Sequence, residues 1–227
     1  MIRFARPGEN EDPLPVFKSK AAAAALLTLT LLGCARDGEL TATGITVTRS
    51  ACPAVAIPAA TGDITLFTPE NARTADAIDV VAHITNLRTT CDESGDNIVA
   101  TVNFEIRGQR RDAAGAREVV LPYFGAVVQG GTNVLSKSIS RVGLNFADGQ
   151  LRASSTGTAT ASVSRAAATL PEDIRRQITR ERKPGDADAA VDPMADPAVR
   201  EAVRRASFEL LVGFQLTQEQ LAYNATR

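Results

Sequence analysis

The chain has 227 residues, of which 44% are hydrophobic and 22% are charged, a composition typical of a globular protein. Its formal net charge of −1 lacks the basic excess that nucleic-acid-binding proteins normally carry, so the composition disfavours a nucleic-acid partner. Aromatic residues make up only 4%, and a Thr- and Val-rich chain with 16 Gly and 11 Pro favours β structure with many turns.

The first 33 residues are predicted to be a signal peptide. Lys18 and Lys20 precede Ala21–Leu32, a stretch of 12 residues without a charge, and this order of basic residues and apolar core is typical of secretory signals. A transmembrane helix needs about 20 apolar residues, so the core is too short to span a bilayer. We therefore expect the chain to be exported.

The apolar core ends in Leu31-Leu32-Gly33-Cys34, which resembles the lipobox of bacterial lipoproteins. The resemblance implies that a signal peptidase recognises the first three residues and cleaves before Cys34, whose thiol and new amino group then carry fatty acyl chains such as palmitate. Two or more chains anchor a protein stably, because each buried CH₂ contributes about 0.8 kcal/mol. Ala35 follows Cys34 where an Asp would favour the inner membrane, so we expect the outer membrane, with the domain facing the periplasm. An ordinary signal peptide is the alternative.

The two other cysteines are predicted to form a disulfide, because export places them in an oxidising compartment. Assigning Cys34 to lipid leaves Cys52 and Cys91 as a pair, and two free buried thiols are the alternative. The bond would close a loop of about 40 residues, which contributes roughly 4 kcal/mol in the chain-entropy model. One His and no Cys-x-x-Cys pair argue against a metal site.

After a tether over residues 34–50, we expect one β domain over residues 51–224. Period-two alternation predicts its strands. These strands are Gly44–Thr48 (still within the tether), Ile78–Thr85, Ile98–Ile106, Phe124–Val128, Leu135–Phe146, Ser154–Val163 and Phe208–Leu216. Pro122 before the fourth of them predicts an edge strand or a bulge. About seven strands at this spacing favour an antiparallel immunoglobulin-like β-sandwich, with a small antiparallel β-barrel as the alternative.

Residues 169–206 break the alternation and predict a helical insertion before the last strand. Thr169-Leu170-Pro171-Glu172 has the pattern of a capping box, and Asp196-Pro197 that of a second helix start. The insertion carries basic and acidic residues in balance, so we expect a solvated arm, with a lipid-binding patch as the alternative. Thr217–Gln220 is another capping box and predicts a short helix that ends near Tyr223.

Several short segments are similar to an uncharacterised family of proteobacterial envelope lipoproteins. They are Cys52-Pro53, Pro122-Tyr123-Phe124 and the stretch from Val212 to Asn224, so the resemblance covers residues 50–224. It implies a place in the cell envelope and brings no known activity. The helical insertion is an addition to that family's pattern.

Motifs for chemistry are missing from the sequence. It holds no Gly-x-Ser-x-Gly elbow, no P-loop, no Gly-x-Gly-x-x-Gly and no His-Glu-x-x-His. His83 is the only histidine, and on the polar face of a predicted strand it favours a structural role. Asp186, Asp188 and Asp192 lack the Gly and terminal Glu of an EF-hand loop, so they indicate an acidic linker. We therefore expect no catalytic residues, no cofactor and no enzyme.

The leading hypothesis is a membrane-anchored envelope lipoprotein whose β domain binds or scaffolds another envelope protein. A periplasmic carrier of a small ligand or lipid is the alternative, and it would require an apolar cavity. A third hypothesis is a hydrolase of cell-wall or glycan substrates that uses paired carboxylates such as Asp79 and Glu105. Nothing in the sequence predicts an oligomeric state.

Overall fold

The computed structural model describes residues 39–41, 44–46, 50–180, 182, 185–188 and 190–226. The predicted signal peptide and the motif Leu31-Leu32-Gly33-Cys34 lie outside these residues. Within the described part of the chain, no helix is both long and apolar enough to cross a membrane.

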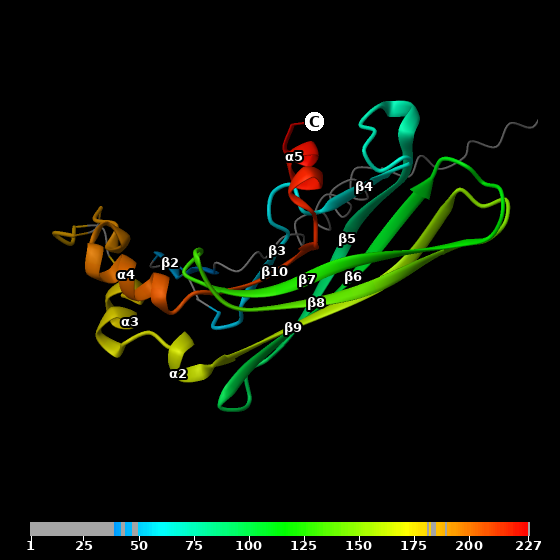
Figure 1. Cartoon of the computed structure of the whole chain (residues 1–227). Coiled ribbons are helices and arrows are strands. Elements are labelled where there is room, and N and C mark those ends of the chain that lie inside the picture. Colours follow the sequence, from blue (N-terminus) through cyan, green and yellow to red (C-terminus); the bar gives the residue numbers. More distant parts are fainter. Residues whose placement is uncertain are drawn as a thin grey trace, which may run out of the picture.

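The domain is mainly β and consists of two four-stranded sheets (Figure 1). The first sheet has the order β3-β10-β7-β8, and its strands are Ala54–Ala56, Phe208–Phe214, Arg117–Gln129 and Asn133–Phe146. The second sheet has the order β4-β5-β6-β9, and its strands are Asp63–Phe67, Ile78–Asp92, Asn97–Arg110 and Arg152–Ser164. All pairs are antiparallel except β3 with β10. A separate antiparallel pair joins β1 (Glu39–Thr41) to β2 (Gly44–Thr46).

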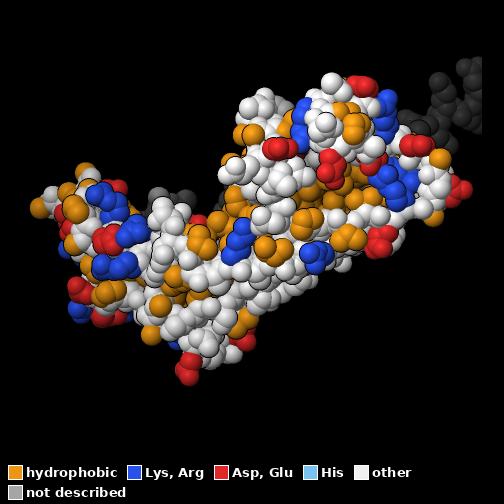
Figure 2. All heavy atoms as spheres, in the orientation of Figure 1, with side chains coloured by type: hydrophobic (Ala, Val, Ile, Leu, Met, Phe, Trp, Pro, Cys, Tyr) orange, Lys and Arg blue, Asp and Glu red, His pale blue; other side chains and the backbone are white. Residues whose placement is uncertain are grey.

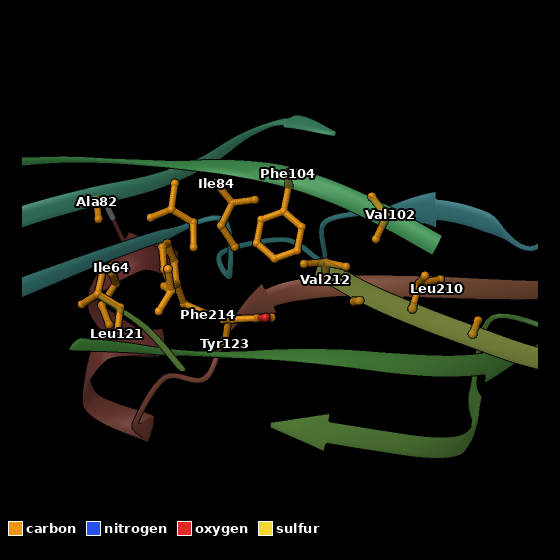
Figure 3. Packing of buried hydrophobic residues seen from close by; sticks show 14 of the residues in the cluster. Ile64, Ala82, Ile84, Val102, Phe104, Leu121, Tyr123, Leu210, Val212 and Phe214 are labelled. Carbon is orange, nitrogen blue, oxygen red and sulfur yellow. The ribbon is translucent and has the colours of Figure 1, made fainter. Parts of the chain in front are cut away.

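One hydrophobic core fills the space between the two sheets (Figure 3). On β6, every second residue from Ile98 to Ile106 is at most 2% exposed, as period-two alternation predicts. Phe104 of β6 meets Tyr123 of β7 edge to face, with ring centroids 5.3 Å apart. The Tyr123 hydroxyl donates to the backbone carbonyl of Thr158, 3.1 Å away, so its one polar atom is satisfied inside the core. These contacts bind the two sheets into one unit.

Two glycines make room for neighbouring core residues, one within the second sheet and one between the sheets. A Cβ on Gly157 would lie 2.4 Å from the Phe104 ring, and a Cβ on Gly125 would lie 2.9 Å from Cβ of Ala159. A larger residue at Gly157 would displace the Phe104 ring of the paired strand, and a larger residue at Gly125 would push the two sheets apart.

The predicted helical insertion before the last strand is confirmed. It holds α2 (Arg165–Ala168), α3 (Glu172–Thr179), the 3₁₀ helix η3 (Pro193–Ala195) and α4 (Pro197–Arg205). These helices form a lobe at one end of the sheets, with a small core of their own around Leu170, Ala202 and Ala206 (Figure 1). The Asp196 side chain accepts from the backbone N–H of Ala198, 2.8 Å away, and caps α4 as predicted.

The C-terminal helix α5 (Gln218–Thr226) covers the outer edge of β4. Its Asn224 side chain donates to the backbone carbonyls of Ala60 and Asp63, at 2.9 and 2.8 Å. Tyr223 packs edge to face on Phe67 of β4, with centroids 5.2 Å apart.

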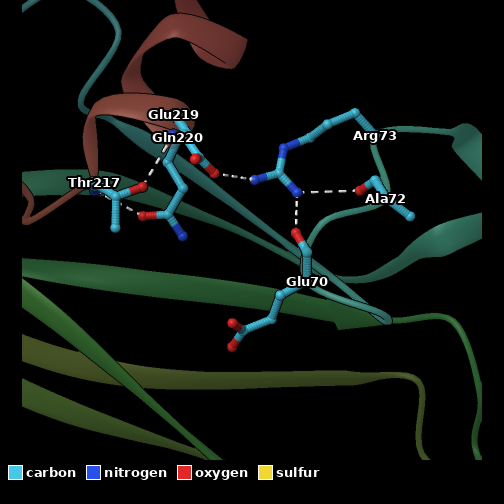
Figure 4. A network of polar contacts seen from close by, with 6 residues as sticks. All are labelled: Glu70, Ala72, Arg73, Thr217, Glu219 and Gln220. Carbon is cyan, nitrogen blue, oxygen red and sulfur yellow. Dashed lines mark hydrogen bonds and ion pairs between the residues drawn. The ribbon is translucent and has the colours of Figure 1, made fainter.

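At its start, α5 has the predicted capping box. The Thr217 N–H donates to Oε1 of Gln220, and the Gln220 N–H donates back to Oγ1 of Thr217 (Figure 4). In the same view Arg73, from the loop before the 3₁₀ helix η2 (Ala75–Ala77), pairs with Glu219 at 3.0 Å and donates to the backbone carbonyls of Glu70 and Ala72. The loop and the helix therefore hold each other in place.

Two predictions need correction, and two strands were missed. Thr169 does not cap a helix, because the N-cap of α3 is Pro171 and the Thr169 hydroxyl donates back to the carbonyl of Arg165, 2.7 Å away. The strands β3 and β4 were not predicted. Pro122 lies neither in an edge strand nor at a bulge, since β7 pairs with both β10 and β8 and its register shift comes later, between Val127 and Val128.

The proline is tolerated because it lies where β10 ends. Pairing of β10 with β7 runs only to Phe214 opposite Tyr123, and the Pro122 carbonyl accepts one more bond from Gln215. The N–H that Pro122 lacks would thus have belonged to the last hydrogen-bonded position between β7 and β10.

Candidate functional site

The predicted disulfide is confirmed, with Sγ of Cys52 bonded to Sγ of Cys91 at 2.12 Å. Cys52 precedes β3 of the first sheet and Cys91 lies near the end of β5 in the second, so the bond links the two sheets. The Glu93 carboxylate completes a group of three potential metal ligands within 4.8 Å. Metals bind thiolates, however, and both thiols are consumed by the disulfide. The cluster is therefore a structural cross-link.

His83 lies on the outer face of the second sheet, in one row with a residue from each neighbouring strand. Asp63, His83, Arg107 and Ser154 stand at equivalent register positions on β4, β5, β6 and β9. Nδ1 of His83 bonds to the Asp63 carboxylate. Ser154 is two strands away, about 10 Å at the usual strand spacing, with Arg107 in between. A nucleophile and its base must be within hydrogen-bond reach, so the row does not form a Ser-His-Asp triad.

The two acids chosen from the sequence, Asp79 and Glu105, are not brought together. Asp79 lies six positions along β5 from Thr85, the residue paired with Glu105, which corresponds to about 20 Å. Carboxylates of glycoside hydrolases lie about 5 to 10 Å apart. Asp79 accepts two hydrogen bonds from Arg117, at 3.0 and 2.9 Å.

Glu105 instead accepts a hydrogen bond from Arg107, 2.9 Å away. This bond, with the charge of the same guanidinium, holds the pKa of Glu105 below its ordinary value. A general acid needs a raised pKa, so the environment of Glu105 is opposite to the one that such a role requires.

The acids of the helical lobe also have structural partners. Asp188 pairs with Arg180 and lies 3.7 Å from Nε of Arg182, while the Asp192 side chain accepts from the N–H of Met194 and caps η3. On β9, the Thr158 hydroxyl donates to Oδ1 of Asn103 at 2.8 Å, as expected for a polar strand face.

A hollow of about 480 Å³ lies on the outer face of the second sheet. His83, Glu105, Arg107 and Arg152 are among the residues that line it. A lipid or apolar ligand needs an enclosed cavity with apolar walls. This hollow is open to solvent and has the charged side chains of Glu105, Arg107 and Arg152 in its wall, so it does not support the carrier hypothesis.

The most unusual surface is the first part of β8, residues Asn133–Arg141, which we call the β8 edge. All nine residues are exposed, although the strand pairs with β7 along this stretch. Val134, Leu135 and Ile139 are 58%, 50% and 60% exposed. Such large apolar side chains are usually buried, and several of them on one strand indicate an interaction site.

Two cations stand among these apolar residues. Lys137 places its ammonium 4.5 Å from the ring centroid of Phe124, and Arg141 lies two residues beyond Ile139. Neither forms an ion pair with any described residue. Figure 2 shows hydrophobic and basic side chains interspersed along the strip that β7 and β8 occupy in Figure 1.

The sequence contains a sign of this exposure that the strand prediction missed. Ser136, Ser138 and Ser140 occupy the positions that continue the buried row of Val142 and Leu144. Serines at inward positions indicate that this half of the strand extends past the core.

No protein-family model, curated protein or solved structure matches the chain, so its own residues and geometry carry the functional assignment.

Proposed function

We propose that the protein is a lipoprotein of the bacterial cell envelope, anchored through an acylated Cys34 and with its β domain facing the periplasm. The observation that carries this proposal is the motif Leu31-Leu32-Gly33-Cys34 at the end of an uncharged stretch of 12 residues. The disulfide between Cys52 and Cys91 supports export, because structural disulfides persist in oxidising compartments. Ala35 after Cys34 favours the outer membrane.

The β domain, in this proposal, binds or scaffolds another envelope component and catalyses no reaction. The chemically active side chains singled out above support this, since His83, Asp79 and Glu105 each have a structural partner and do not converge. The long exposed β8 edge supports a binding role.

We further propose that the fold is a variant of the immunoglobulin-like β-sandwich. Two mostly antiparallel sheets around one core and a disulfide between them support this type. The chain departs from the antibody pattern in having no Trp to pack on the disulfide. By analogy alone, such domains use their loops and edge strands for contact with partners.

The anchor is tested in a Gram-negative host by mass spectrometry of the mature N-terminus and by membrane fractionation. Cys34→Ala is expected to abolish acylation and cleavage, whereas Leu32→Ala, at the variable position of the lipobox, is the matched control and is expected to be processed normally. Blocking signal peptidase II should make the unaltered precursor accumulate. A mature N-terminus at another residue, without lipid, overturns the anchor.

A further inference from the structure

The four edge strands of the two sheets differ in how far they are protected. β3 has three residues, and β4 has five and lies under α5. β9 is long, but its exposed side chains from Ser154 to Ser164 are all Ser or Thr. Proteins normally shorten, cover or make polar their sheet edges, because a bare edge pairs with other chains. Among these four described edges, the β8 edge alone is long and rich in exposed aliphatic side chains.

The β8 edge has backbone groups available for pairing. Every second residue of an edge strand directs its N–H and C=O away from its neighbour, in this case away from β7. The side chains of residues 133–141 are exposed on both faces of the strand, so they are accessible to an added strand.

The charge of the β8 edge determines which kind of strand can pair with it. Outer-face side chains alternate along Lys137, Ile139 and Arg141, and residues 133–141 include no acid. Pairing two copies of this strand would gather four cations and no anion on one stretch of sheet, which disfavours a homodimer through this edge. An added strand with acids opposite Lys137 and Arg141 and an aliphatic residue opposite Ile139 would match both the charges and the apolar surface.

We propose that the β8 edge binds an extended segment of an envelope partner by strand addition, and that this segment has the pattern acid, small polar, aliphatic, small polar, acid. The small polar positions would fall on the other face, beside Ser138 and Ser140. Main-chain bonds to β8 provide the affinity and the alternate side chains provide the specificity. This inference rests on the proposed binding function and is independent of the lipid anchor.

The probe for this site is a fluorescein-labelled heptapeptide, Thr-Glu-Ser-Val-Thr-Glu-Thr, with a matched peptide in which both Glu are Lys. Each is titrated into the purified full chain and followed by fluorescence anisotropy. We expect saturable binding of the Glu peptide alone. Amide hydrogen exchange is expected to slow over residues 133–141 when the Glu peptide is bound.

A double variant tests the charge argument. Lys137→Glu with Arg141→Glu is expected to weaken binding of the Glu peptide about tenfold, because two favourable cross-strand charge pairs become unfavourable. The same variant is expected to bind the Lys peptide more tightly. The matched control is Arg111→Glu with Arg152→Glu, which makes the same change of charge at two exposed cations, one directly after β6 and one at the start of β9, and should leave binding unchanged. Circular dichroism should show that both variants are folded.

Each other outcome overturns the inference. These outcomes are absence of saturable binding by the unaltered chain, equal loss in the control variant, and protection of β9 in place of β8. The unaltered chain is also tested for self-association and for binding to anionic phosphatidylglycerol vesicles. If either occurs and the Lys137→Glu, Arg141→Glu variant abolishes it, the edge binds a second copy or lipid instead.

Crosslinking in cells separates this inference from the proposed binding function. A photo-crosslinking residue is placed at Ile139, on the β8 edge, or at Ser162, on β9. Capture of an acidic, extended partner segment from Ile139 alone supports strand addition at β8. Capture from Ser162 alone is consistent with the proposed binding function but contradicts strand addition at the β8 edge. Capture from neither position contradicts both proposals.

Discussion

The guanidinium carbon of Arg110 lies 5.4 Å from the centroid of the Phe146 ring, and Arg110 is only 3% exposed. Among the described residues, no carboxylate forms an ion pair with this buried cation. Its N–H groups donate instead to four backbone carbonyls, of Ala113, Gly115, Ala147 and Gln150, at 2.5, 2.7, 3.0 and 2.8 Å. One side chain thereby fastens the loop after β6 to the loop after β8.

Replacing Arg110 by Met should therefore lower the free energy of unfolding by about 3 kcal/mol, because four carbonyls lose a charged donor. Arg110→Lys should recover little of this, since an ammonium cannot reproduce the planar fork of donors. Urea unfolding gives the magnitude. Arg111→Met, an exposed neighbour, is the control, and a loss there as large as that of Arg110→Met would contradict the assignment.

The disulfide should contribute about 4 kcal/mol, from the chain-entropy estimate for cysteines 39 residues apart. The double variant Cys52→Ser, Cys91→Ser is expected to unfold at correspondingly lower urea concentration. Thiol titration of the unfolded, unreduced protein should count no free thiol from this pair. If adding reductant leaves the unfolding midpoint of the unaltered protein unchanged, the bond does not stabilise the domain.

Two threonines with the same capping pattern should behave differently. Thr217→Ala removes a reciprocal capping box and should cost about 1 kcal/mol of stability. Thr169→Ala removes only an exposed hydrogen bond to the carbonyl of Arg165 and should change stability by less than about 0.5 kcal/mol. Thermal unfolding of both variants is the measurement, and equal losses would contradict the structure.

Stability should decrease in acid, in part through Glu201. A hydrogen bond from Arg204 is the main reason that the pKa of Glu201 lies below its usual value of 4.5. Because the folded-state pKa is lowered, the contribution of Glu201 is present above the unfolded value and is lost as pH falls through the folded one. The stability difference between the unaltered chain and Glu201→Gln should thus be present at pH 7 and vanish below the lowered pKa. Urea midpoints from pH 7 to pH 3 test this, and a difference that persists unchanged to pH 3 would contradict the prediction.

Strands whose side chains alternate cleanly were predictable from the sequence. β6 and β10 have apolar residues at every second position, and each packs that face on the core. The pairing of Cys52 with Cys91 followed from counting cysteines after Cys34 was assigned to lipid. The helical insertion and the Thr217 box were predictable because they depend on local contacts.

Features that depend on distant contacts were not predictable. β3 is only three residues long and exists because β10 pairs with it. In the sequence, Arg110 cannot be distinguished from any other arginine. It becomes a buried hydrogen-bond donor only because two loops converge on it. The β8 edge had an alternating pattern, but which half of the strand leaves the core depends on where the second sheet ends.

The position of Cys52 also determines how the domain responds to force. A pull on the chain from its N-terminal side reaches Cys52 before it reaches β3, and the covalent bond passes the load to Cys91 on the 15-residue strand β5. While the disulfide is intact, the three residue pairs that join β3 to β10 therefore do not bear the load. After reduction the same pull would act on those three pairs directly, so the oxidised domain should unfold at a markedly higher force in a single-molecule pulling experiment.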